Sequence, residues 1–276
     1  MKNLLLRGLT GVLYVILITG SILLNRYTFA GLFSILLFFC LREFYGLLNT
    51  HKKVHISTVY NSAGGVLLFV SAGLYASGAF PSAVFAVYLL YLVGLWVSGL
   101  YTKPSDPLVH TAYVLLGQCY IALPFALLNF LVFPDCLSSG TYYPLFLLSL
   151  FVFIWLSDTG AFVVGMLWGK HRLFPRISPK KSWEGFFGGL FFTVASSFIF
   201  AYYEPVIPYH HWIGIAVWVV IFGTWGDLVE SLIKRTLGIK DSGSALPGHG
   251  GFLDRIDSLL LAVYAAVIYV QVIIQN

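Results

Sequence analysis

The segment 231–257 concentrates most of the residue types that can do chemistry. It holds four basic residues, three acids, a histidine and five glycines, in a chain that is 59% hydrophobic. Ionisable groups next to membrane-spanning segments are energetically costly, so a dense cluster of them usually marks a functional site. Carboxylates bind divalent cations, basic side chains bind phosphates, and glycines let the backbone approach an anion closely. This mixture indicates phosphate chemistry at a membrane surface.

One predicted helix face carries polar groups into this segment. Asp227, Ser231 and Lys234 are spaced at i, i+4 and i+7 near the end of an apolar run, so they share a face, with Glu230 at its edge. Asp227 follows two glycines, and we expect a ligand or an ion as its partner. The sequence leaves two interpretations open for Lys234 and Arg235. They could bind a phosphate of the substrate, or they could reach toward lipid headgroups, as long basic side chains at a helix end often do.

Two further acids stand at the start of the next apolar run. Asp254 and Asp257 are three residues apart, so both can face the same point. An acid in the first turn of a helix is stabilised by the helix dipole, which accounts for one of them but not for both. Asp227 and Asp254, on adjacent antiparallel helices, could together bind a divalent cation through oxygen ligands.

The stretch between these acids supplies other candidate groups. Lys240 offers a point charge for a phosphate. Asp241 could bind a metal or orient Lys240, and the sequence favours neither role. Gly250 and Gly251 allow backbone N–H groups to turn toward anionic oxygens. His249 could donate to a phosphate, although a lone histidine between glycines more often has a structural role. The pattern is not that of a P-loop.

A second group of candidates lies further toward the N-terminus. Asp158 stands late in an apolar run, where an unpartnered acid would be costly. We therefore expect it to point into one cavity together with the acids described above. Lys180, Lys181 and Ser182 cluster just before a predicted helix, and a helix start favours anion binding. We therefore expect these three residues to contact a specific phosphate, and interpret the arginines before them as contacts to anionic headgroups.

The composition places all these residues in a membrane protein. Only 10% of the residues are charged and the mean hydropathy is +0.87, whereas soluble domains carry about 25% charged residues. We predict an all-α integral membrane protein, a polytopic bundle of about nine transmembrane helices forming a single membrane domain over 1–276. The apolar runs centre on 9–25, 28–48, 58–77, 81–100, 108–129, 144–168, 184–203, 211–233 and 257–275.

The distribution of charge predicts the topology. With a cytoplasmic N-terminus and nine spans, all 16 Lys and Arg residues except Arg26 fall on the cytoplasmic side, as the positive-inside rule requires. Eight of the 11 acids lie in 151–276. We therefore expect the catalytic spans and cytoplasmic loops in 151–276, and a scaffold or oligomer interface in 1–150.

Residues 231–257 resemble the signature of the phosphatidate cytidylyltransferase (CDP-diacylglycerol synthase) family, S-x-[LIVMF]-K-R-x4-K-D-x-[GSA]-x2-[LIF]-[PG]-x-H-G-G-[LIVMF]-x-D-R-[LIVMFT]-D. The match runs without a gap from Ser231 to Asp257. The stretch SDTGAFVVGMLWGK and the later RISPKKSWEG are also similar to the family, with Ser182 where relatives often have Thr. The resemblance covers the C-terminal half closely, and the first half only in its hydrophobic spans.

The resemblance implies an enzyme that joins CTP and phosphatidic acid to give CDP-diacylglycerol and pyrophosphate. It further implies a homodimer that uses Mg²⁺, with a monovalent cation such as K⁺ beside it. Its partners would be the two substrates and membrane lipids, not nucleic acid. The compact length favours a bacterial inner (plasma) membrane, with the active site facing the cytoplasm.

The resemblance also implies a role for each matching residue. Asp227 and Asp254 would be the principal metal ligands, with Asp241 and Asp257 assisting. The phosphates would be held by Lys234, Arg235, Lys240 and Arg255. A phosphatidate oxygen would attack the α-phosphorus of CTP without any protein nucleophile, while metal and lysines offset the repulsion between the two anions.

Two other classes of function fit parts of the sequence. A CTP-dependent polyprenol or dolichol kinase, or another lipid cytidylyltransferase, would share the phosphate-binding groups. An ion-coupled transporter would also carry acids within its spans. Against a transporter, the charges gather at the ends of the spans rather than at the midplane, and no inverted repeat is visible.

Overall fold

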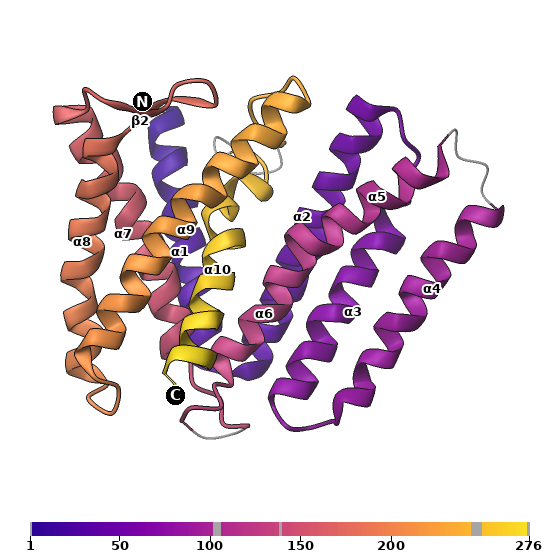
Figure 1. Ribbon diagram of the computed structural model, residues 1–276, viewed down its shortest axis with the longest axis horizontal. Helices are drawn as coiled ribbons and strands as arrows, with labels where there is room; N and C mark the ends of the chain where they lie inside the picture. The colour runs from indigo at the N-terminus through magenta and orange to yellow at the C-terminus, as the bar shows by residue number, and fades with distance from the viewer. Residues whose placement is uncertain (1, 102–105, 138–139, 244–249, 275–276) are drawn as a thin grey trace.

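The computed structural model describes residues 2–101, 106–137, 140–243 and 250–274. Almost all of its regular structure is helical (Figure 1). In chain order the elements are α1 (Lys2–Leu24), α2 (Arg26–Lys52), α3 (Thr58–Ala76), the short η1 (Ser82–Phe85), α4 (Ala86–Tyr101), α5 (Pro107–Gly117), the π-helical η2 (Gln118–Ala122), α6 (Leu123–Val132), α7 (Leu145–Trp168), β1 (Arg172–Phe174), β2 (Ser178–Ser182), α8 (Trp183–Tyr203), α9 (Tyr209–Thr236), η3 (Leu253–Arg255), α10 (Asp257–Ile268) and the π-helical η4 (Tyr269–Ile273).

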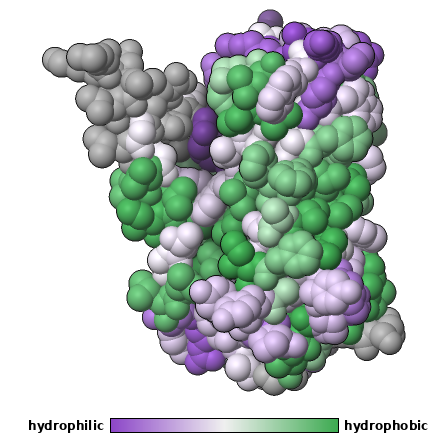
Figure 2. All heavy atoms as spheres, turned by 90° about the vertical axis from the view of Figure 1, so that its left-hand side faces the viewer, coloured by the Kyte–Doolittle hydropathy of each residue, from purple (hydrophilic) through white to green (hydrophobic). Residues whose placement is uncertain are grey.

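The helices have the length and composition of membrane spans. Within the described residues, seven helical segments are long and apolar enough to cross a bilayer, and 10–24 and 257–273 form two shorter apolar helices. Figure 2 shows a hydrophobic belt around the middle of the face that α7 and α8 form, with hydrophilic residues gathered at the end that carries the hairpin. The protein is therefore an α-helical integral membrane protein.

The structure is consistent with the predicted all-α class, and it adds one short sheet. Between α7 and α8, β1 and β2 pair as an antiparallel hairpin, with Arg172 opposite Ser182 and Phe174 opposite Ser178. Two prolines, Pro175 and Pro179, stand in this segment and disfavour a helix there, because proline lacks an N–H donor. The hairpin brings the basic residues of β2 back over the end of the bundle (Figure 1).

Glycines set how closely the C-terminal helices pack. A Cβ added to Gly185 on α8 would lie 2.7 Å from the carbonyl oxygen of Ala161 on α7. A Cβ on Gly226 of α9 would lie 2.6 Å from the carbonyl oxygen of Asp257 on α10. A side chain at either position would push the backbones apart, so small residues let these helices approach as they do in membrane bundles generally.

The N-terminal helices pack through large side chains, and a Cβ on Gly64 or Gly65 of α3 would meet the side chains of Tyr91 and Leu41 rather than backbone. The buried face of α2 includes Phe29, Phe33, Leu37 and Phe44, spaced so that they follow one side of the helix. Phe33 lies edge-on to Phe151 of α7, with ring centroids 5.8 Å apart. Through such contacts α2 connects the two halves of the molecule, while its last turns lie near the α9–α10 connection.

Candidate active site

A cavity of about 850 Å³ lies among α1, α7, the hairpin and the α9–α10 connection. Its apolar lining includes Leu13 and Leu17 from α1 and Phe151 and Trp155 from α7. Its polar lining, called the polar wall below, contains most of the residues singled out in the sequence: Asp158, Lys180, Lys181, Ser182, Asp227, Asp254, Arg255 and Asp257. The cavity thus offers both apolar surface and charged groups.

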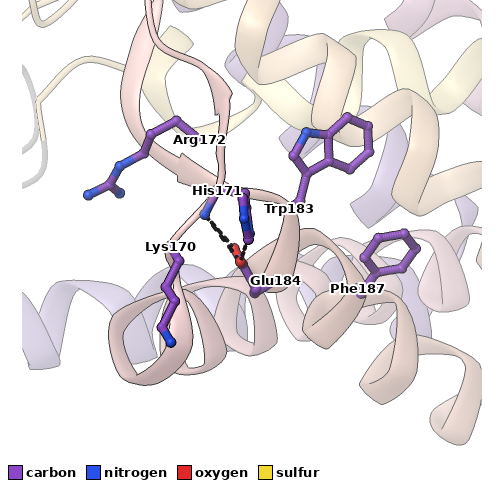
Figure 3. Close-up of a pocket in the computed structure, with 6 residues that line it drawn as sticks. All are labelled: Lys170, His171, Arg172, Trp183, Glu184 and Phe187. Carbon is purple, nitrogen blue, oxygen red and sulfur yellow. Dashed lines mark hydrogen bonds and ion pairs between the residues drawn. The ribbon is translucent and has the colours of Figure 1, made fainter.

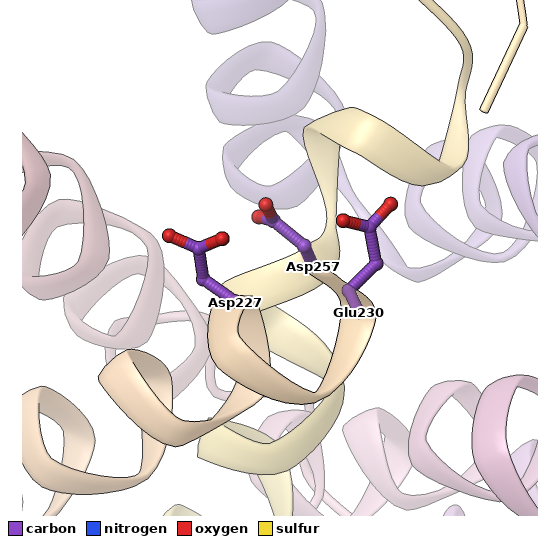
Figure 4. A group of neighbouring side chains, drawn as sticks. All are labelled: Asp227, Glu230 and Asp257. Carbon is purple, nitrogen blue, oxygen red and sulfur yellow. The ribbon is translucent and has the colours of Figure 1, made fainter. Parts of the chain in front are cut away.

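Three carboxylates form a compact group beside this cavity. Oxygens of Asp227, Glu230 and Asp257 all lie within 4.8 Å of one another (Figure 4). Asp227 and Glu230 come from consecutive turns of α9, and Asp257 is the first residue of α10. The close approach at Gly226 places the start of α10 next to this part of α9. Three acids so close together repel one another unless cations lie between them.

Two lysines supply positive charge to this acidic group. The ammonium of Lys181, on β2, forms an ion pair with Asp227. The ammonium of Lys234 forms an ion pair with Glu230 one turn earlier on α9, and also lies 2.8 Å from Oδ1 of Asp254. Glu230 has no exposed surface, so its charge depends on this contact and on its neighbouring groups.

Asp254 organises the backbone around it. Its Oδ2 accepts the backbone N–H of Ser242 at 3.0 Å and that of Gly251 at 2.9 Å, while its Oδ1 accepts from Lys234. Gly250 adopts a φ of 82°, and a Cβ there would lie 2.6 Å from Oδ2 of Asp254. Burial alone would raise the pKa of the Asp254 carboxyl, but the hydrogen bonds from Lys234 and the two N–H groups hold it below its ordinary value.

Among the predicted metal ligands, the structure thus gathers some and separates others. Asp227 and Asp257 belong to the acidic group, together with Glu230. Asp254 lines the same cavity but uses both oxygens on Lys234 and the loop backbone. Asp241 is exposed and does not line the cavity.

The predicted substrate-binding residues divide in the same way. The cavity is lined by Asp158, Lys180, Ser182 and Arg255. The hydroxyl of Ser182 also caps α8, because it accepts the backbone N–H of Gly185 at 3.1 Å. Lys240 and Arg235 are exposed and do not line it; Arg235 instead donates to the carbonyl oxygen of Ile239 at 3.3 Å. Gly250 and Gly251 form the turn around Asp254. His249 lies outside the described residues.

Two functional candidates were missed in the sequence. Glu230 was placed at the edge of the polar face, although its position four residues before Lys234 already predicts an ion pair. Glu43 stands in the N-terminal half, yet it hydrogen-bonds to the α9–α10 connection. The signal for Glu43 is that it is the only acid among the first 105 residues and stands within an apolar run.

A second, shallow hollow of about 750 Å³ lies on the outer side of the hairpin (Figure 3). It is lined by Lys170, Arg172, Trp183 and neighbouring residues. Within it, the carboxylate of Glu184 accepts the backbone N–H of His171 at 3.1 Å and lies 2.6 Å from Nδ1 of the His171 ring. None of the acidic group reaches this hollow. We therefore assign the chemistry to the larger cavity.

Comparison with known proteins gives a consistent result. Residues 5–273 match the model of the "Cytidylyltransferase family". The chain is 31% identical over 261 residues to a phosphatidate cytidylyltransferase of Staphylococcus haemolyticus (strain JCSC1435), covering 93% of this chain and 95% of that protein. It is 39% identical to that of Staphylococcus aureus (strain COL) and 42% identical to that of Staphylococcus epidermidis (strain ATCC 12228 / FDA PCI 1200), each over 164 residues that cover 59% of this chain and 60% of the relative.

Proposed function

The chain belongs to the cytidylyltransferase family, and from this premise we propose that it joins CTP and phosphatidic acid to give CDP-diacylglycerol and pyrophosphate. The name of its staphylococcal relatives, phosphatidate cytidylyltransferase, states this activity for them. The observation in the structure that supports it most is a cavity that combines an apolar lining with Asp227, Asp257 and Lys181.

The shape of the cavity suits a lipid substrate with a phosphate headgroup. The apolar residues from α1 and α7 offer a surface for acyl chains, and the polar wall offers charge to the phosphate. Lys180 and Arg255 line the polar wall, where they can pair with phosphate oxygens. A water-soluble nucleotide would need only the polar wall, so the apolar side favours a lipid as one of the two reactants.

The charges account for how the reaction proceeds. A phosphatidate oxygen attacks the α-phosphorus of CTP; a new P–O bond forms as the bond to pyrophosphate breaks. Both reactants are anions, so positive charge must offset their repulsion and then the charge on the departing pyrophosphate. Lys181 and Lys234 stand on either side of the acidic group and provide it. No protein nucleophile is needed, since the phosphate of the lipid is itself the nucleophile.

The acidic group has the donor set of a divalent cation site. Oxygen ligands from several carboxylates suit Mg²⁺. Within the described residues, Oε1 of the buried Glu230 has no hydrogen-bond partner and Oε2 contacts only the ammonium of Lys234. Asp227, Glu230 and Asp257 would hold the ion. Bound there, Mg²⁺ would supply positive charge for the nucleotide phosphates. The accompanying K⁺ and the homodimer implied by the resemblance stay predictions.

We further propose nine spans with the N-terminus and the active site on the cytoplasmic side of a bacterial inner membrane. The N-terminus, the hairpin and the α9–α10 connection lie at one end of the bundle and the C-terminus at the other, as an odd number of spans requires (Figure 1). At about 1.5 Å per residue, α1 is about 35 Å long, enough to cross a hydrocarbon core of about 30 Å. The excess of basic residues at this end supports a cytoplasmic assignment.

The proposed activity is tested with the purified full-length chain in lipid nanodiscs. We expect pyrophosphate release that requires CTP, phosphatidic acid and Mg²⁺ together, with CDP-diacylglycerol as the lipid product. Omitting either substrate should abolish release. Transfer of the γ-phosphate of CTP to a polyprenol would instead identify a lipid kinase, and the absence of any turnover by folded protein would contradict the proposal.

A further inference from the structure

Glu43, near the C-terminal end of α2, contacts the connection between α9 and α10. Its Oε2 accepts the backbone N–H of Phe252 at 2.9 Å, and its Oε1 accepts that of Leu253 at 3.2 Å. The hydroxyl of Ser242 also donates to Oε1. Glu43 therefore binds both described arms of this connection, 240–243 and 250–253, and joins them to a helix nearly 200 residues away in the chain.

The two arms are shaped to receive this carboxylate. A Cβ on Gly243 would lie 3.0 Å from Oε2 of Glu43, and a Cβ on Gly251 would overlap with Oε1. The same added atom on Gly243 would also lie 3.5 Å from the Cα of Gly251. Glycine at these two positions thus lets the arms close around the side chain, with backbone donors directed at its oxygens.

A second contact from α2 supports the same connection. The ring of Phe39, one turn before Glu43, stacks on that of Phe252 with centroids 5.3 Å apart and planes 16° apart. Phe39 and Glu43 are four residues apart and so lie on the same face of α2. Together they hold Phe252 through its ring and through its backbone N–H.

The arms that Glu43 holds are hydrogen-bonded to Asp254, which lines the cavity. The N–H of Ser242 and the N–H of Gly251 both donate to Asp254, and Asp254 is paired with Lys234, which in turn contacts Glu230 of the acidic group. A shift of the arms would therefore move Asp254 and release Lys234. Glu43 itself does not line the cavity.

We propose that Glu43 is a positioning residue for nucleotide binding: it fixes the arms 240–243 and 250–253 so that Lys234 and the loop backbone meet the phosphates of CTP. This inference rests on the proposed function. A carboxylate is required because three donors converge on it, and an ionised carboxylate only accepts. A glutamine would direct an NH₂ group at one of these donors. The apolar surface that we propose for the acyl chains comes mainly from α1 and α7, and the arms contribute only Phe252 to the cavity lining, so we expect the KM for phosphatidic acid to change much less than that for CTP.

The kinetic test compares Glu43→Gln and Glu43→Asp with Arg42→Gln, a charge change at the exposed neighbouring residue. We expect Glu43→Gln to lower kcat/KM for CTP at least tenfold, mainly through KM, and to change the KM for phosphatidic acid less than twofold. Glu43→Asp keeps the charge and should recover part of the loss, while Arg42→Gln should behave as wild type. An unchanged KM for CTP in Glu43→Gln would overturn the proposal, as would equal losses for both substrates with a lower Tm.

A second measurement tests the contact itself without relying on turnover. Hydrogen exchange in the substrate-free protein should be at least tenfold faster at the amides of Phe252 and Leu253 in Glu43→Gln, and unchanged in Arg42→Gln. Equal exchange in both variants would overturn the inference even if the enzyme is active. Conversely, wild-type protein that lacks cytidylyltransferase activity but shows this exchange difference would contradict the proposed function and leave the contact established.

Discussion

The two halves of the molecule keep their helices together by different means. In the C-terminal half, glycines bring α7 to α8 and α9 to α10, and the approach of α9 to α10 brings their acids within 4.8 Å of one another. In the N-terminal half, α2 packs through a row of buried aromatic and aliphatic side chains, and Glu43 is the one acid on it. The difference shows that close backbone approach in the C-terminal half brings the carboxylates of the acidic group together. The large side chains of the N-terminal half instead pack α2 firmly, and Glu43 on α2 then holds the α9–α10 connection.

The largest effect should come from an acid of the C-terminal half. Asp227→Asn removes one carboxylate of the acidic group and the partner of Lys181, and should lower kcat by about 100-fold or more. The matched change in the N-terminal half is Asp106→Asn, because Asp106 caps α5 through the N–H of Val109 and asparagine caps equally well. Its activity should stay within twofold of wild type. Pyrophosphate release measures both, and similar losses in the two variants would contradict the division between the halves.

Replacing the half-buried Lys234 should reduce stability as well as activity. Lys234→Met leaves the fully buried Glu230 without its ion pair, which should cost on the order of 3 kcal/mol. Lys53→Met, at an exposed position after α2, should cost nothing measurable. Thermal unfolding in detergent gives both values.

The double variant separates the two roles of Lys234. Lys234→Met combined with Glu230→Gln should regain part of the lost Tm, because the fully buried Glu230 position then carries no unpaired charge, while Asp254 still lacks its lysine partner. It should stay inactive, because Lys234 also serves the phosphates. Recovery of turnover in the double variant would show that Lys234 acts only by neutralising Glu230.

A glycine substitution tests the close approach of α9 and α10. The Cβ of Gly226→Ala would lie 2.6 Å from the carbonyl oxygen of Asp257, so the helices must separate, at about 1–3 kcal/mol. Gly46→Ala on α2 meets nothing within 4 Å and should leave the Tm unchanged or raise it slightly, because alanine favours a helix interior over glycine. Wild-type Tm and turnover in Gly226→Ala would show that the acidic group does not depend on this packing.

The smallest effect is expected for the exposed acid of the connection. Asp241→Asn should lower kcat/KM for CTP less than threefold, because Asp241 is exposed and does not line the cavity. The same pyrophosphate assay measures it. A loss as large as that of Asp227→Asn would mean that the connection closes over the nucleotide and brings Asp241 to the phosphates.

Much of the site was predictable because its residues are close in sequence. The spacing predicted that Asp227, Asp254 and Asp257 would face one region, with Asp227 and Asp254 as the principal ligands of a cation. The structure places Asp227 in one group with Asp257 and Glu230 instead. The burial of Glu230 depends on how α9 packs, which the helix period alone does not specify. The bonding of Asp254 to the backbone depends on the turn at Gly250, so spacing could not separate it from the acidic group.

The contribution of the N-terminal half was not predictable in this way. No spacing relates Glu43 to Phe252, since their contact forms only when α2 packs beside the α9–α10 connection. The hairpin was also missed, because its strands are short and basic and read as a loop. The apolar runs, by contrast, predicted the positions of the helices well, because the length of a span is fixed by the bilayer.

The most direct test of the account is the binding of Mn²⁺, used in place of Mg²⁺, to the purified protein and followed by electron paramagnetic resonance. The account predicts that wild type and Asp241→Asn bind the ion alike. It also predicts that Asp227→Asn and Asp257→Asn each weaken binding at least tenfold while the protein stays folded. Wild-type affinity in both of these variants would contradict the assignment of the cation to the acidic group.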